Sequence, residues 1–80
     1  MKASEKLLNL DKRMIVDKNV HAKVYVNYEN CNVKDDCFLI GVFGTGRDFE
    51  EACEDYLNQI SGKTIVFNAE SSKREEVKVL

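Results

Sequence analysis

The segment DFEEACEDYLNQISG, residues 48–62, decides the fold of this 80-residue chain. Asp48 and Glu51 have the spacing of a capping box, in which side chains bond the unpaired N–H groups of a helix's first turn. The apolar residues that follow recur at helical period and form one stripe: Phe49, Ala52, Cys53, Tyr56, Leu57 and Ile60. Ser61-Gly62 supplies a stop, because glycine readily adopts the left-handed conformation that ends many helices. The pattern predicts an amphipathic helix between these two signals.

Two strands are expected after this helix. Residues 63–67 are rich in β-branched and aromatic side chains, which favour strands. Residues 68–73 are small or polar and indicate a turn or short loop. Val77 and Val79 alternate with their neighbours, so we expect the C-terminus to form a final strand.

Two more strands are expected before the helix. Residues 20–28 alternate as a half-buried strand does, and one face holds Val20, Ala22, Val24, Val26 and Tyr28. Residues 29–36 are polar and indicate a hairpin loop. Residues 37–43 are apolar on both faces, which predicts a strand that is covered on both sides or abuts a partner. Gly41 within it suggests a bulge or a close backbone approach, and Gly44-Thr45-Gly46 is expected to end the strand.

The N-terminus is expected to form a first helix over residues 5–13, with Ser4 as its N-cap. Residues 14–16 either end that helix or form a short extended piece. The expected order is α-β-β-α-β-β in a single small α+β domain over residues 1–80. We expect two layers, a four-stranded and mostly antiparallel sheet with helices on one face. A right-handed crossover is expected if the strands on either side of the second helix are parallel.

The outer face of that sheet is expected to be unusually apolar. If the helices cover one face, made of Val24, Val26, Phe38, Ile40 and Val42, then Tyr25, Leu39, Phe43 and Val66 lie opposite. This is more apolar surface than a solvated face should carry. Three explanations remain open, namely that the first helix packs there, that another molecule does, or that the strand register differs.

Composition excludes several classes of protein. The chain is 44% hydrophobic and 32% charged, which is typical of a globular protein and not of a disordered tail, a collagen-like repeat or a disulfide scaffold. No apolar run approaches the ~18 residues of a membrane span, and residues 1–5 lack the apolar region of a signal peptide. We therefore expect an intracellular protein. A chain of this size buries only roughly 60–65% of its unfolded surface, so a homo-oligomer, with a dimer as the first guess, is expected.

Charge is unevenly distributed along the chain. The net charge is +3 over residues 1–28, −6 over residues 29–60 and +1 over residues 61–80. The acidic middle includes a ridge on the second helix, opposite its apolar stripe: Glu50, Glu51, Glu54 and Asp55. This acidic ridge is either a contact for a basic partner, in the manner of nucleic-acid phosphates, or a solvated face that keeps the protein soluble.

Candidate catalytic and cofactor motifs are incomplete. The run Gly44-Thr45-Gly46-Arg47 precedes a helix as phosphate-binding loops do, but position 49 is Phe where the third glycine should stand. Cys31 and Cys37 are too far apart for a zinc knuckle and have no second pair, although they flank a loop and could form a disulfide. Cys53 is expected in the core, and His21 has no motif around it. We expect no enzymatic activity, no cofactor and no metal.

Two binding functions remain as alternatives. Basic residues gather toward the N-terminus, with Tyr25 and Tyr28 close behind: Lys2, Lys6, Lys12, Arg13, Lys18 and Lys23. Stacking of bases on sheet aromatics would suit a nucleic-acid-binding accessory protein. Alternatively, Arg47, Lys63 or the N-terminal lysines would capture a small anionic nucleotide signal at a subunit junction, as an oligomeric sponge.

The stretch DFEEACEDYLNQISGKTIVF, residues 48–67, carries a resemblance, together with the Lys-, Asn- and Glu-rich character of the chain. It resembles the small uncharacterised proteins of phages and prophages of low-GC Gram-positive bacteria. The resemblance implies a role in the cytoplasm of an infected or lysogenic host. It implies a non-enzymatic protein that binds and inhibits a host protein, for example an anti-phage defence effector in the manner of an anti-CRISPR protein. The expected contact is the acidic ridge or the apolar outer face with Tyr25, Leu39 and Phe43.

Overall fold

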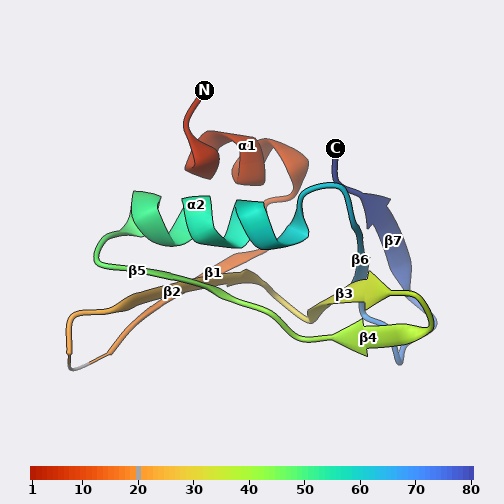
Figure 1. Ribbon diagram of the computed structural model, residues 1–80. Helices are drawn as coiled ribbons and strands as arrows, with labels where there is room; N and C mark the ends of the chain where they lie inside the picture. Colours follow the sequence, from red (N-terminus) through yellow and green to blue (C-terminus); the bar gives the residue numbers. More distant parts are fainter. Residues whose placement is uncertain (20) are drawn as a thin grey trace.

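The computed structural model describes residues 1–19 and 21–80. Over these residues the chain forms two helices and seven strands in two antiparallel sheets, so the α+β class is confirmed (Figure 1). The elements are α1 (Ala3–Leu10), β1 (Met14–Lys18), β2 (Val24–Tyr28), β3 (Cys31–Asp35), β4 (Phe38–Ile40), β5 (Gly44–Gly46), α2 (Phe49–Ile60), β6 (Thr64–Phe67) and β7 (Glu75–Lys78). The predicted order α-β-β-α-β-β is wrong, because five strands instead of two lie between α1 and α2.

The predicted single sheet is also wrong. A three-stranded sheet has the order β1-β2-β5, and a four-stranded sheet has the order β4-β3-β6-β7. All five strand pairs are antiparallel, so no parallel crossover joins the strands around α2. α2 packs on β5 and β2, and α1 packs on α2. Figure 1 shows both helices on the same side of the three-stranded sheet, with α1 outermost.

The second helix has the predicted signals at both ends. The Asp48 carboxylate accepts a hydrogen bond from the N–H of Glu51 at 2.8 Å, as an N-cap does. Gly62 has a φ of +76°, the left-handed conformation expected just after the helix. The apolar stripe is buried at Ala52, Cys53, Tyr56 and Ile60. Phe49 departs from the prediction, because it lies in the first turn and remains 38% exposed.

The first helix differs at both ends from its prediction. It begins at Ala3, so Ser4 lies inside its first turn instead of capping it. It ends at Leu10, because Asp11 is extended and its carboxylate binds the backbone N–H and guanidinium of Arg13. The chain is then free to form β1, which settles the two readings of residues 14–16 in favour of an extended piece.

The strand predicted over residues 20–28 is shorter than expected. Val24, Val26 and Tyr28 are buried, so the predicted inward face of β2 is confirmed. Ala22 has a φ of +61° and lies in a turn, as does His21. Val20 lies outside the described residues.

The loop predicted over residues 29–36 is a strand between two tight turns. Asn30 and Asp36 have positive φ, which Asn and Asp tolerate better than other side chains. Between them, β3 pairs with both β4 and β6. Its sequence CNVKD hides the strand, because only Val33 is fully buried and hydrogen bonds on both edges hold the polar residues in place.

The strand predicted over residues 37–43 is confirmed only at residues 38–40, and residues 41–43 belong to no strand. Residues 38–40 form β4 at the edge of one sheet, and Gly44-Thr45-Gly46 does not end a strand but forms β5 in the other. A Cβ at Gly44 would lie 2.5 Å from Cβ of Tyr56, and one at Gly46 would lie 2.5 Å from the backbone nitrogen of Ala52. Both glycines therefore allow α2 to pack directly on β5. The close approach expected at Gly41 occurs at these two positions.

Tyr28 joins the parts of the core. Its ring lies 5.6 Å from that of Tyr56 and 5.5 Å from that of Phe67. Its N–H donates to the Tyr56 hydroxyl at 3.2 Å, and its own hydroxyl donates to the carbonyl of Leu7. Burial raises the pKa of Tyr28 and raises that of Tyr56 to about 12, so both hydroxyls stay protonated. One aromatic cluster thus connects α1, α2 and both sheets.

Candidate functional site

Glu50, the first residue of the acidic ridge, contributes to the packing of the two helices. Glu50 of α2 accepts hydrogen bonds from the backbone N–H of Ser4, at 3.1 Å, and from the Ser4 hydroxyl. These bonds lower the pKa of Glu50. α1 has no side-chain N-cap of its own, so a carboxylate from α2 satisfies one of its unpaired N–H groups. Glu50 therefore attaches one helix to the other.

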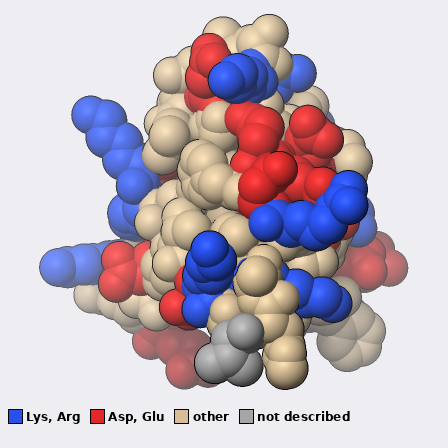
Figure 2. Space-filling model, turned by 90° about the vertical axis from the view of Figure 1, so that its left-hand side faces the viewer, with Lys and Arg blue, Asp and Glu red and all other residues tan. Residues whose placement is uncertain are grey.

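Two other members of the ridge also have partners within the chain. Asp55 accepts from the backbone N–H of Thr45 at 2.9 Å and from the amide of Gln59 at 3.2 Å. Glu51 pairs with Arg47 at 3.6 Å. Glu54 forms no hydrogen bond or ion pair with any described residue, and it lines a hollow with Lys2 and Lys6. Figure 2 shows acidic side chains with Lys and Arg beside them at the end where α2 begins.

The face of the three-stranded sheet that points away from the helices is open. We call the following residues the open face: Ile15, Asp17, Tyr25, Asn27 and Phe43. Asp17 pairs with Tyr25 across β1 and β2, and Ile15 pairs with Asn27. Tyr25 and Asn27 alternate with the buried residues of β2, so they and their cross-strand partners lie on the opposite side of the sheet. Phe43 precedes β5 and lies beside Tyr25. α1 packs on α2, so it does not cover this face, and the first of the three explanations is wrong.

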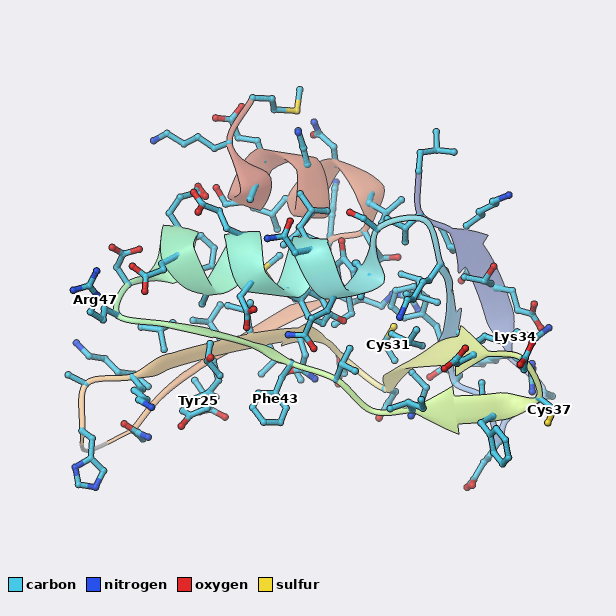
Figure 3. The ribbon with its side chains drawn as sticks, viewed as in Figure 1. Tyr25, Cys31, Lys34, Cys37, Phe43 and Arg47 are labelled. Carbon is cyan, nitrogen blue, oxygen red and sulfur yellow. The ribbon has the colours of Figure 1, made fainter. Side chains whose placement is uncertain are left out.

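Two aromatic side chains form the centre of the open face. The rings of Tyr25 and Phe43 lie 5.5 Å apart at an angle of 60°, and Figure 3 shows them side by side on the side opposite the helices. The Tyr25 hydroxyl accepts from the Asn19 amide at 3.0 Å. The Phe43 carbonyl accepts from the Gln59 amide at 2.9 Å. These bonds hold the Tyr25 ring and the backbone of Phe43, whose side chain is 53% exposed.

A hollow of about 260 Å³ adjoins this pair and is lined by Asp17, Tyr25, Asn27 and Phe43. Asp17 is exposed and has no ion-pair partner among the described residues. Two aromatic rings beside a carboxylate and an amide have the chemistry that attracts a cation with an apolar stem, because ring faces and carboxylates both attract positive charge.

Leu39, predicted to belong with this pair, lies elsewhere. It lines a separate hollow with three asparagines, Asn30, Asn32 and Asn68. Val66 is fully buried, so its predicted place on an exposed face is wrong. Phe38 and Ile40, expected beneath the helices, are 69% and 43% exposed. They lie on β4, at the edge of the four-stranded sheet, whereas α2 packs on β2 and β5 of the other sheet.

The three cysteines are all free. Cys31 begins β3 and Cys37 follows its end, so the length of the strand separates them and they do not form the disulfide considered above (Figure 3). Burial raises the pKa of Cys31 and that of Cys53 to about 11. Cys53 is fully buried in the core, as predicted. Cys37 is exposed.

Three of the features expected to bind anions or nucleic acid are engaged within the fold. Tyr28 is fully buried and cannot stack on a base. Arg13 binds Asp11 and Glu75, and its guanidinium lies 3.9 Å from the centre of the Phe67 ring. Gly44-Thr45-Gly46 packs beneath α2 and cannot surround a phosphate.

Comparison with known proteins adds no family. No family model matches the chain, and neither do curated proteins or solved structures. Among residues 1–19 and 21–80, no group of three or more His, Cys, Asp or Glu side chains is arranged to hold a metal ion. No helix in the same residues is long and apolar enough to cross a membrane.

Proposed function

We propose that this chain is a non-enzymatic binding protein that inhibits a host protein, such as an anti-phage defence effector. The open face makes the contact, and the partner contributes a basic side chain. The observation that carries the proposal is the Tyr25–Phe43 pair beside the carboxylate of Asp17.

Arginine suits this arrangement better than other side chains. Its planar guanidinium stacks on aromatic rings and binds carboxylates, and its stem is apolar. Asp17 would pair with the guanidinium while Tyr25 and Phe43 cover the stem. Because a hydrogen bond already holds the Tyr25 ring, its ordering adds little to the side-chain entropy cost of binding.

The acidic ridge is a weaker candidate for the contact. Glu50 and Asp55 already bind backbone N–H groups of this chain. A partner that used them would have to break those bonds, and the freed N–H groups would lose their partners. The resemblance of residues 48–67 to small phage proteins supports a host protein as the partner.

In the first step of the experiment, the immobilised chain captures a partner from a cell extract of a low-GC Gram-positive bacterium. In the second step, binding to that purified partner is measured for the wild type and for variants. The double variant Tyr25→Ala/Phe43→Ala should lose that protein, and calorimetry should show at least a roughly tenfold weaker affinity, since aromatic contacts dominate such interfaces. The capture should also inhibit the partner's activity.

Phe49→Ala serves as the matched control, because Phe49 is also a partly exposed phenylalanine but lies on α2. It should bind as the wild type does. Equal binding by the wild type and a folded double variant would show that the open face is not the contact surface. Loss of binding in Glu54→Lys alone would favour the acidic ridge.

A further inference from the structure

We infer that β4 is a self-association edge, at which a second copy of this chain pairs antiparallel with β4 about a two-fold axis at Leu39. This inference does not depend on the proposed function, because β4 belongs to the four-stranded sheet and the open face to the other.

The four sheet edges of the described residues differ in how they are protected. The outer edge of β5 is closed by α2, because Asp55 binds the N–H of Thr45 and Gln59 binds the carbonyl of Phe43. β7 has three charged residues in its four, and β1 ends in Asp17-Lys18. Charges on an edge discourage pairing with another strand. β4, with the sequence Phe-Leu-Ile, has neither device.

The sequence of β4 is complementary to itself. With Leu39 opposite Leu39 of the second copy, Phe38 lies opposite Ile40 and Ile40 opposite Phe38. Bonded and non-bonded pairs alternate in an antiparallel ladder. Along β4, the N–H and carbonyl groups therefore point alternately toward β3 and away from it, and those that point away are available to a second strand. No charged residue lies in the paired segment, so no like charges meet across the axis.

A hollow beside Ile40 has room for the phenylalanine of the second copy. It measures about 220 Å³, and its apolar lining consists of Val33, Ile40 and Val42. Ile40 pairs with Val33 across β3 and β4, so its side chain lies on the same face as this core residue. Pairing would place Phe38 of the second copy next to Ile40 at this hollow. The most exposed residue of β4 would then be buried.

The charged residues around the hollow are compatible with the same register. Lys63 and Asp35 of one copy both line the hollow beside Ile40, and no ion pair joins them within the described chain. The register places Asp36 of each copy opposite Val42 of the other, and Val42 lines the same hollow. Asp36 of the second copy therefore comes close to the hollow that holds Lys63 and Asp35. Because β4 is only three residues long, the dimer should be weak, with a Kd of ~10–100 µM.

Sedimentation equilibrium over a range of protein concentrations tests this arrangement. The wild type should convert from monomer to dimer as its concentration rises through the Kd. Leu39→Lys and Leu39→Glu should each be monomeric, because each puts like charges opposite one another at the axis. An equal mixture of the two variants should restore a dimer, because the opposed charges then attract. Leu8→Lys, at a leucine of similar exposure on α1, should dimerise as the wild type does.

Circular dichroism establishes that each variant is folded, and Phe38→Ser supplies a second monomeric variant if a Leu39 variant does not fold. A wild type that stays monomeric at millimolar concentration would overturn the inference and leave β4 open to a strand of another protein. Dimerisation of folded Leu39→Lys, or failure of the mixture to associate, would overturn the proposed axis.

Discussion

The carboxylate of Asp55 accepts a hydrogen bond from the backbone N–H of Thr45 at 2.9 Å, and so a helix side chain closes the exposed edge of a strand. Gln59, one turn later on α2, binds the carbonyl of Phe43 on the same edge. The sequence alone presents Asp55 as part of a charged surface. In the structure its carboxylate is the hydrogen-bond partner of a strand edge.

Asp55→Ala should destabilise the protein by about 1–2 kcal/mol, because it leaves the Thr45 N–H without its partner. It should also promote aggregation by opening the edge of β5. Chemical denaturation and light scattering measure the two effects. Asp55→Asn keeps an acceptor oxygen and should lose less stability; an alanine variant as stable as the wild type would show that the bond is unimportant.

Gly44→Ala should destabilise the protein by at least ~3 kcal/mol, because its Cβ would overlap the backbone and side chain of α2. That is most of the stability that a core of this size supplies. Gly41→Ala is the matched control, since its Cβ would meet only the Asn32 amide at an ordinary 3.8 Å. Thermal denaturation should separate the two variants clearly. Similar melting temperatures would contradict the close packing of α2 on β5.

Acid should weaken the attachment of α1 to α2. The hydrogen bonds from Ser4 lower the pKa of Glu50. A group whose folded pKa is lowered stabilises the fold above its ordinary value of 4.5, and this contribution is lost as the pH falls through the folded pKa. Glu50→Gln should therefore melt below the wild type at pH 7, and the difference should vanish near roughly pH 2. A difference that persists unchanged in acid would contradict this role of the carboxylate.

Only Cys37 should react readily with a thiol reagent in the folded protein. Cys37 is exposed, whereas burial raises the pKa of Cys31 and Cys53 to about 11 and leaves little thiolate at neutral pH. Brief alkylation followed by mass spectrometry should label one site in the native protein and three after denaturation. Rapid labelling of Cys53 in the native state would mean that α2 detaches from the core.

Sequence reasoning predicts those parts of the fold whose signals are local. The helix over Phe49–Ile60 has a cap, a stripe and a stop within one segment, and β2 has a clear alternation. β3 and β5 escape prediction because long-range pairing holds them in place: only Val33 of β3 is fully buried, and β5 is Gly-Thr-Gly. Glycine usually weakens a strand, and it is tolerated here because only glycine fits beneath α2.

In the candidate site, too, local sequence signals are predictive and long-range contacts are not. Tyr25 and Phe43 are placed together by the predicted strand faces, and the structure brings them together although Phe43 lies outside any strand. Asp17 and Asn27 are missed, because their place beside the pair depends on the register of β1, β2 and the approach to β5. The acidic ridge shows the opposite failure, since a helical pattern cannot show that Glu50 binds Ser4 across a separation of 46 residues.

A titration of the isotope-labelled protein with N-acetyl-arginine methylamide, followed by nuclear magnetic resonance, tests the central claim most directly. The account predicts saturable shifts at Asp17, Tyr25 and Phe43, and much smaller ones with the citrulline analogue, which is neutral and of similar shape. Asp17→Asn should weaken the arginine response. Equal responses to arginine and citrulline, or shifts confined to the acidic residues of α2, would contradict the assignment of the open face as the contact for a basic side chain.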